Sequence, residues 1–342
     1  MGAKKVSVVF HRVEQAGFYP WGRRNRVLGD LNETFEALRQ WGRGKRFSLT
    51  RLVDRRGEED LPVYLLGIEQ VGRDWVFATW NRVPDAEGKI PSISMNSVVG
   101  DRPQIHLNEI QEDTIPGFAT YFWVVPEHDV VATVRIETRA TGKDAMRGYV
   151  ERFLETESGY VVSEAERGVV GYRALDKRGD ILKVRPMFRL SPFVKPGPIN
   201  YIRRHREQIV RVIRTGHLEA ANAQERQVAQ GLFAWFRGAR RDHQLVDHRR
   251  VKLELDFTPS ADELDAMIEA ELEADAVSAW DDLGFQLAGD MSTTHWVGRA
   301  VAGDSPTFDL PDAQGGVYDL GEIGRELAAR RRDLFKTLDH DG

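Results

Sequence analysis

The sequence predicts an α+β protein with mixed or antiparallel sheets and flanking helices. Apolar residues at every second position, typical of strands, and at every third or fourth position, typical of helices, both recur along the 342 residues. These patterns do not follow the strict strand–helix alternation that produces a parallel sheet covered by helices. The length allows about two domains, with ample apolar surface for a core.

The N-terminal third is expected to contain a strand, a helix and a hairpin. In order along the chain, these are a strand over residues 5–12, a helix presenting Leu31, Phe35 and Leu38 on one face, and hairpin strands over 61–70 and 75–81. The segment 84–104 is rich in Pro, Gly and Ser, which indicates a loop.

A second hairpin and a helix are expected in the middle of the chain. The hairpin strands cover residues 117–125 and 130–137, on either side of an acidic turn. The helix begins near Lys143, and the residues it presents to a core are Met146, Tyr149, Val150, Phe153 and Leu154. Strand patterns then return over residues 160–190.

Residues 199–214 are predicted to form an amphipathic helix with one apolar and one basic stripe. On a helical wheel the apolar stripe consists of Ile199, Ile202, Ile209 and Ile213, and the basic stripe consists of Arg203, Arg204, Arg211 and Arg214. A second helical pattern follows within residues 216–250. This part of the chain is therefore expected to be a basic helical arm.

The C-terminal part is expected to combine strands and helices. Its elements are a strand over 251–257, a helix opened by the capping-box spacing of Ser260 and Glu263, a strand pair around 295–301 and 307–310, and a closing helix over 320–338. Prolines at 196 and 198 mark an expected change from strand to helix. Three parts are therefore expected: an α+β domain over 1–198, the basic arm over 199–250, and an acidic α+β domain over 251–342.

Charge is segregated along a chain whose net charge is only −5. Residues 183–252 contain 16 Lys and Arg against 5 Asp and Glu, and residues 1–56 contain 13 against 5. Residues 253–342 contain 6 against 21. Two basic regions in an acidic protein indicate a surface that binds a polyanion, with nucleic acid as the expected ligand.

The sequence lacks the motifs of common catalytic sites. It has no cysteine, no phosphate-binding P-loop, no G-x-S-x-G elbow, no H-E-x-x-H zinc helix and no dinucleotide-binding G-x-G-x-x-G. We therefore expect a protein without catalytic activity, cofactor, metal or small-molecule substrate. Apolar runs of about six residues, against the ~20 that cross a bilayer, and no apolar segment at the start predict a cytoplasmic protein.

Basic residues continue from a strand through the expected helix, which favours a phosphate-binding surface. The candidate DNA-binding residues are Lys183, Arg185 and Arg189 on one strand face, Lys195, the helix arginines Arg203, Arg204, Arg211 and Arg214, and the arm residues Arg237, Arg240, Arg241, Arg249 and Arg250. Because no recognition-helix motif is present, we expect binding to double-stranded DNA that is largely independent of sequence and strongly dependent on salt.

Other interpretations stay open. The segment Asp180-Ile-Leu-Lys183 resembles the tail of a nuclease D-x-K pattern, so a metal-dependent defence nuclease is one alternative. A protein–protein adaptor with a basic face that meets an acidic partner is another. A further hypothesis is that the acidic region 253–342 covers the basic surface until DNA displaces it.

The order of several motifs resembles that of the RexA proteins of temperate-phage exclusion systems. The matching segments are Gly17-Phe-Tyr19 with Arg23-Arg-Asn-Arg26, Asp74-Trp-Val-Phe-Ala-Thr79, Glu112-Asp113, Gly117-Phe118 with Tyr121-Phe-Trp-Val124, Val131-Ala-Thr-Val-Arg135, Trp296-Val-Gly-Arg-Ala300 with Gly303-Asp304, and Arg332-Asp-Leu-Phe-Lys336. The resemblance covers most of the chain, except residues 216–246, which look like an insertion.

The resemblance implies a dimeric, DNA-binding cytoplasmic sensor with a role in abortive infection. In that family the sensor detects a replication or recombination intermediate of an invading phage and activates a RexB-type membrane ion channel. It also implies a fold distantly like the RdgC-type DNA-binding rings. Arg299 matches a strand position where the family places basic residues, so it joins the candidate DNA-binding residues.

Overall fold

The computed structural model divides the chain into two compact units. It describes residues 2–52, 62–83, 91–106, 113–137, 142–176, 179–194, 196–219, 248–273, 280–298, 301–313, 315–336 and 338. Unit 1 contains Met1–Phe193 and Gly303–His340, and unit 2 contains Val194–Ala302. Both units combine antiparallel sheets with helices, which confirms the predicted α+β class.

Unit 1 is built on one large antiparallel sheet. Among the described residues its strands are β1 (Gly2–Tyr19), β2 (Val63–Val71), β3 (Asp74–Arg82), β4 (Ser92–Ser94), β5 (Ile105–His106), β6 (Thr114–Val125), β7 (Val130–Ile136), β10 (Arg185–Pro192), β15 (Gly303–Asp304) and β16 (Thr307–Leu310). The main strand order is β10-β1-β7-β6-β3-β2. A small separate hairpin consists of β8 (Val161–Glu164) and β9 (Gly168–Tyr172).

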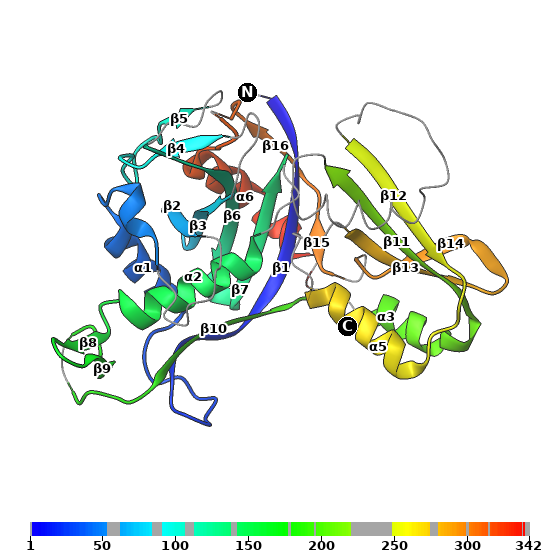
Figure 1. Cartoon of the computed structure of the whole chain (residues 1–342), viewed down its shortest axis with the longest axis horizontal. Coiled ribbons are helices and arrows are strands. Elements are labelled where there is room, and N and C mark those ends of the chain that lie inside the picture. Colours follow the sequence, from blue (N-terminus) through cyan, green and yellow to red (C-terminus); the bar gives the residue numbers. More distant parts are fainter. Residues whose placement is uncertain are drawn as a thin grey trace. The chain divides into compact units, whose positions relative to one another are not determined.

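The long first strand organises this sheet. Along its length β1 pairs with β16 at residues 2–5, with β7 at residues 6–12 and with β10 at residues 11–19. Figure 1 shows β1, in dark blue, running through the unit with β7 and β10 beside it. Because β1, at the start of the chain, pairs with strands from its middle and its end, it joins distant segments into one core.

Helices cover both faces of the unit 1 sheet. The helix α6 (Leu320–Phe335) packs on one face, where its Ile323 and Leu327 are fully buried against residues such as Phe10. On the other face lie α1 (Leu31–Gly42) and α2 (Lys143–Thr156). The five core residues predicted for α2 are all buried, so its expected apolar face is confirmed.

Local sequence signals explain where these helices begin. Asp30 and Glu33 form a reciprocal capping box at the start of α1, in which each side chain accepts a backbone N–H that the helix leaves unpaired. Asp319 accepts the backbone N–H of Glu322 at the start of α6. The short helices η1 (Phe47–Thr50) and η2 (Pro126–His128) connect elements of the same unit.

Unit 2 is a four-stranded antiparallel sheet with helices. The described strands follow the order β12-β11-β13-β14, with bounds His248–Leu255, Ile209–Glu219, Trp280–Leu287 and Asp290–Trp296. The helices are α3 (Pro196–Arg204), η3 (Arg206–Gln208) and α5 (Ala261–Glu273). At the start of α5, Glu263 accepts the backbone N–H of Ser260 at 2.8 Å and its own N–H reaches the Ser260 Oγ at 3.3 Å, which confirms the predicted capping box.

The predicted helix over residues 199–214 is wrong in its second half. The helix α3 ends at Arg204, and the chain continues through η3 into strand β11. The residues from Ile209 to Thr215 contain mostly β-branched side chains, whose stiffness favours an extended backbone. Pairing with β12 on one side and β13 on the other then stabilises the strand.

The C-terminal segments also pair differently from the expectation. The strand β14 pairs with β13 in unit 2, whereas β16 pairs with β1 in unit 1, so the expected strand pair around 295–301 and 307–310 does not form. The two units divide the chain after Phe193 and after Ala302, whereas the sequence predicted boundaries at 198 and 250. Residues after 302 return to unit 1 because β16 and α6 bury Phe308, Leu310 and Ile323 in its core.

No helix in the described part of the chain combines the length and apolar character that a membrane crossing requires.

Candidate nucleic-acid interface

The candidate DNA-binding residues are distributed over both units. Lys183, Arg185 and Arg189 belong to unit 1, and Arg203, Arg204, Arg211 and Arg214 belong to unit 2. The backbones of Arg249 and Arg250 lie in β12, paired with β11. The candidates Lys195, Arg237, Arg240, Arg241 and Arg299, and the helical pattern expected around Trp235, lie outside the described residues.

The arginines of the predicted stripe do not share one face. Arg203 and Arg204 lie on α3, whereas Arg211 and Arg214 lie on β11. Their spacing of three along a strand places Arg211 and Arg214 on opposite faces of the sheet. The predicted continuous basic stripe is therefore absent, because it depended on a helical period that the chain follows only to Arg204.

Three of these arginines are engaged in ion pairs within unit 2. Arg203 Nε lies 2.8 Å from Asp265 Oδ1, and Arg214 Nη2 lies 3.3 Å from Glu271 Oε2. Arg211 contacts two carboxylates on the neighbouring segment, Asp256 at 2.6 Å and Glu254 at 3.1 Å. The hydrogen bond from Arg211 holds the pKa of Asp256 below its usual range, so this pair is ionised at neutral pH.

These pairs join the basic and acidic segments of the sequence, but as part of the fold of unit 2. The residues between 253 and 302 include β13, whose Leu283 and Phe285 are buried in the unit 2 core. The residues after 302 supply β16 and α6 to unit 1. The acidic region is thus not a separable cover, and deleting it would remove core elements of both units.

The start of the second basic region lies beside part of the N-terminal basic region in unit 1. Strand β10 pairs with the second half of β1, so that Arg185 lies opposite Tyr19 and Arg189 opposite Gln15. The chain leaving Tyr19 enters a loop that contains Arg23, Arg24 and Arg26, all exposed. In Figure 1 this loop extends, in blue, beyond the end of β1 near β10. Sheet pairing therefore brings residues about 170 positions apart in the sequence to one surface.

We define the unit 1 basic surface by seven cationic side chains. They are Arg12, Arg23, Arg24, Arg26, Lys183, Arg185 and Arg189. Arg185 and Arg189 face away from the neighbouring Phe188, which is fully buried against the α1 and α2 side of the sheet. This alternation confirms the predicted strand face for Arg185 and Arg189, while Lys183 is exposed just before β10 begins.

Aromatic rings support two of the cations. The Arg185 guanidinium lies 5.4 Å from the centre of the Trp21 ring, and the Arg12 guanidinium lies 4.7 Å from that of Phe193. The Nε atom of Arg185 is buried and has no hydrogen-bond partner among the described residues. Glu14 also lies on the paired strands β1 and β10, where it accepts a hydrogen bond from Ser191.

The dimensions of this surface suit a polyanion. From Arg12 to Tyr19 the strand extends about 23 Å at ~3.3 Å per residue, which matches about seven base pairs of duplex. Within the described residues, no ion pair joins Arg23, Arg24, Lys183, Arg185 or Arg189 to a carboxylate. Their charges are therefore available to an external phosphate, in contrast to those of Arg203, Arg211 and Arg214.

Local sequence patterns do not reveal whether the basic N-terminal region shares a surface with the residues after 182. Arg12 was missed as a candidate, and Arg23, Arg24 and Arg26 were noted only as part of a family motif. The signal that pointed to them was the excess of cations in residues 1–56. Without the pairing of β1 with β10, that excess could not be connected to Arg185 and Arg189.

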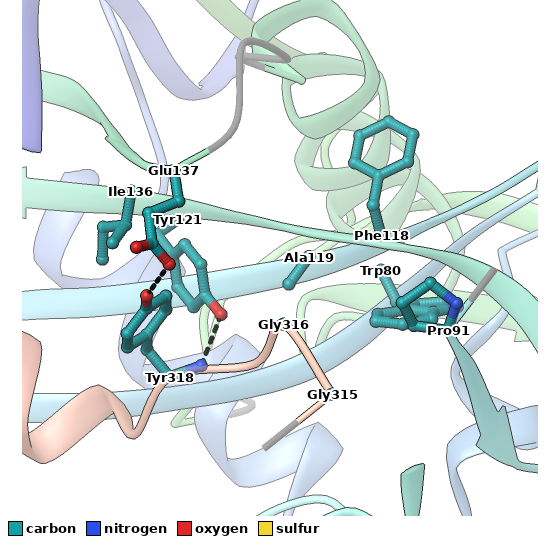
Figure 2. Close-up of a pocket in the computed structure, with 10 residues that line it drawn as sticks. All are labelled: Trp80, Pro91, Phe118, Ala119, Tyr121, Ile136, Glu137, Gly315, Gly316 and Tyr318. Carbon is teal, nitrogen blue, oxygen red and sulfur yellow. Dashed lines mark hydrogen bonds between the residues drawn. The ribbon is translucent and has the colours of Figure 1, made fainter. Parts of the chain in front are cut away.

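A small pocket of about 170 Å³ is a second feature of unit 1. Figure 2 shows that Trp80 and Phe118 flank one end of it and Tyr121, Tyr318 and Glu137 the other. Tyr318 donates a hydrogen bond to the Glu137 carboxylate, which also accepts one from Lys4 at 2.9 Å. These bonds, that from Tyr318 first, hold the pKa of Glu137 below its usual range. The pocket thus combines aromatic walls with a carboxylate whose charge Lys4 compensates.

The bond from Tyr318 is expected to contribute to stability in a pH-dependent way. We expect Tyr318→Phe to lower the free energy of unfolding by about 1 kcal/mol at pH 7, a small value because Glu137 is half exposed. The lowered pKa of Glu137 means that this contribution is present above the ordinary glutamate pKa and is lost as the pH falls through the folded-state pKa. Urea unfolding of the wild-type protein and Tyr318→Phe between about pH 3 and 7 measures the difference in their free energies of unfolding. A difference that grows as the pH falls would contradict a stabilising bond to the ionised Glu137.

Neither a metal site nor a similar protein gives further information about the unit 1 basic surface. No three His, Asp or Glu side chains in the described ranges are grouped as a metal site would require. No family model matches the sequence, and no curated protein is significantly similar to it. The resemblance to RexA proteins therefore rests on the sequence motifs alone.

Proposed function

We propose that this protein binds double-stranded DNA without catalysis and largely without reading its sequence, through the unit 1 basic surface. The observation that carries the proposal is the pairing of β1 with β10, which places Arg12, Arg185 and Arg189 on one pair of strands and brings Lys183 and the loop residues Arg23, Arg24 and Arg26 to its end. Five of these cationic side chains have no carboxylate partner within the described residues, namely Arg23, Arg24, Lys183, Arg185 and Arg189. A group of arginines and a lysine offers charge contacts to phosphates, and such contacts carry no sequence information, which supports sequence-independent binding.

The biological role that we propose follows the family resemblance. As in the RexA proteins that it resembles, this chain would act in the cytoplasm as a homodimer that senses phage DNA. Binding would then be signalled to a membrane effector of the RexB ion-channel type, in phage exclusion by abortive infection. The motifs from Gly17 to Lys336 support this role, and the DNA-binding surface supplies the sensing step.

Salt dependence tests the DNA-binding step directly. A fluorescein-labelled duplex of about 30 base pairs is titrated with the full chain at several salt concentrations without divalent metal, and binding is followed by anisotropy. With about five to seven phosphate contacts, log K should fall against log salt with a slope of about −4 to −6. No binding at low salt would overturn the proposal and turn attention to an acidic protein partner. Nicking of plasmid DNA with Mg²⁺ or Mn²⁺, lost in Asp180→Ala, would favour the nuclease instead.

A further inference from the structure

Trp21 differs from the other large aromatic residues of unit 1 in its exposure. Its relative accessibility is 73%, whereas Trp75, Trp80 and Trp123 are at most 1% exposed. An exposed tryptophan offers a large ring face that a ligand or partner can contact. Trp21 lies at the start of the loop that carries Arg23, Arg24 and Arg26.

The loop around Trp21 is held in a defined shape. The Arg23 N–H donates to the Pro20 carbonyl at 3.1 Å and Gly22 has a φ of +71°, so Trp21 occupies the second position of a tight turn that requires glycine next. Further along, the Val27 N–H donates to the Phe18 carbonyl at 2.9 Å. The returning chain passes so close to Gly17 that a Cβ there would lie 2.0 Å from the Gly29 carbonyl oxygen. The ring is thus presented by a rigid turn, which limits the conformational entropy that binding costs.

The surroundings of Trp21 select the kind of ligand. The Arg185 guanidinium lies 5.4 Å from the ring centre, and Arg23 and Arg24 are exposed on the same loop. Cations next to an open indole ring match a nucleotide, because the cations attract the phosphate and the ring stacks on the base. In a continuous duplex both faces of each base are already stacked on neighbours, so the indole gains this contact only by unstacking a step.

We propose that Trp21 stacks on an unpaired nucleobase, so that DNA with a single-stranded gap or end is the preferred substrate of the unit 1 basic surface. This inference rests on the proposed DNA binding and names the DNA structure that the surface selects. The phosphates of intact and gapped DNA meet the same cations, and only the gapped DNA offers a free base face to Trp21. One aromatic–base stack corresponds to about a tenfold gain in affinity.

Anisotropy titrations of the full chain test the preference. The probes are an intact duplex of about 30 base pairs and the same duplex with a central gap of about six nucleotides, at one salt concentration. The wild-type protein should bind the gapped probe about tenfold more tightly, and Trp21→Ala should bind both probes equally. Trp21→Phe, which keeps a smaller ring, should retain part of the preference. Because the ring is exposed, these changes leave the core intact.

Leu49→Ala is the matched control, since Leu49 is another exposed apolar residue of unit 1, at 65% accessibility. It should retain the full preference. Equal binding of both probes by the wild-type protein would overturn this inference while the DNA-binding proposal stands, and failure to bind either probe would overturn both. Binding to vesicles containing phosphatidylserine that Trp21→Ala abolishes, without a preference for gapped DNA, would assign the ring to a membrane surface and overturn the inference.

Discussion

Arg185→Glu/Arg189→Glu is expected to weaken binding of an intact 30-base-pair duplex by about 30-fold or more near 0.1 M salt. Both side chains project from the same face of β10, and neither has a carboxylate partner in the described part of the chain. Losing two phosphate contacts should reduce the slope of log K against log salt by about two in magnitude. The new carboxylates also repel the DNA phosphates. Anisotropy titrations at several salt concentrations measure both quantities.

A matched control is Arg82→Glu/Arg102→Glu, which makes the same change in charge at two other exposed arginines of unit 1. Arg82 ends strand β3, which β1, β7 and β6 separate from β10 in the sheet. We expect this variant to change the affinity by less than about threefold, through net charge alone. Equal losses in the two double variants would mean that DNA binding follows total charge, and would contradict a defined surface on β1 and β10.

The candidate arginines of unit 2 provide a second comparison. Arg204 is exposed, and its Nε donates to the backbone carbonyl of Asn200 instead of a carboxylate. Arg203 and Arg211 already contact Asp265 and Asp256, so a phosphate must compete with these carboxylates for them. If DNA uses unit 2 as well, Arg204→Glu is the informative change, because it breaks no ion pair among the residues that the structure describes.

Local patterns in the sequence were sufficient to predict a helix where the spacing of apolar residues and the helix-forming tendency of the segment agree. In α2, the spacing of Met146, Tyr149 and Phe153 has one period over the whole segment, and the structure buries that face. The capping-box spacing of Ser260 and Glu263 predicted the start of α5 for the same reason, whereas the box at Asp30 is seen only in the structure. At residues 209–214 two signals compete, because isoleucine and arginine recur at helical spacing while the β-branched side chains favour a strand.

The candidate site was harder to predict because it depends on long-range pairing. Sequence alone placed Arg185 and Arg189 on one strand face, since alternation is a local property. That Arg185 lies opposite Tyr19, and so next to the Trp21 loop, depends on the register between β1 and β10. Nothing local encodes this register. It follows from burying Phe18 and Phe188 together against the helices α1 and α2.

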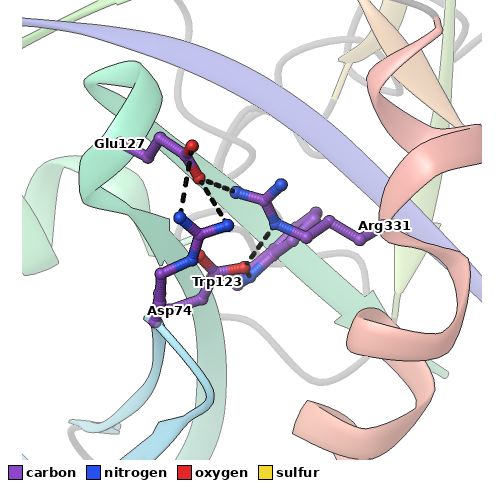
Figure 3. Close-up of polar contacts among 5 residues, drawn as sticks. Asp74, Trp123, Glu127 and Arg331 are labelled. Atoms are coloured by element: carbon purple, nitrogen blue, oxygen red, sulfur yellow. Dashed lines mark hydrogen bonds and ion pairs between the residues drawn. The ribbon is translucent and has the colours of Figure 1, made fainter.

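A second large effect is expected at the contact that attaches α6 to the sheet. Asp74 begins β3, and its side chain is only 8% exposed. Figure 3 shows its carboxylate between Arg331 and Trp123, whose nitrogens donate to Oδ2 at 3.0 and 3.1 Å. Arg331 also contacts Glu127, at 3.1 Å. The other oxygen of Asp74 is buried without a hydrogen-bond partner in the described residues, so the carboxylate depends on Arg331 for its charge compensation.

Arg331→Ala is therefore expected to lower the free energy of unfolding by about 3 kcal/mol, because it leaves a buried carboxylate without a cation. Asp74→Asn in the Arg331→Ala background should recover part of that loss, since an amide keeps an acceptor for Trp123 and carries no charge. Arg325→Ala is the control on the same helix. It removes an exposed pair with Glu322 and should cost no more than about 0.5 kcal/mol. Urea unfolding followed by tryptophan fluorescence measures all four proteins. If Arg331→Ala costs no more than Arg325→Ala, or if Asp74→Asn adds to the loss, then charge compensation of Asp74 is not what fixes α6 to β3.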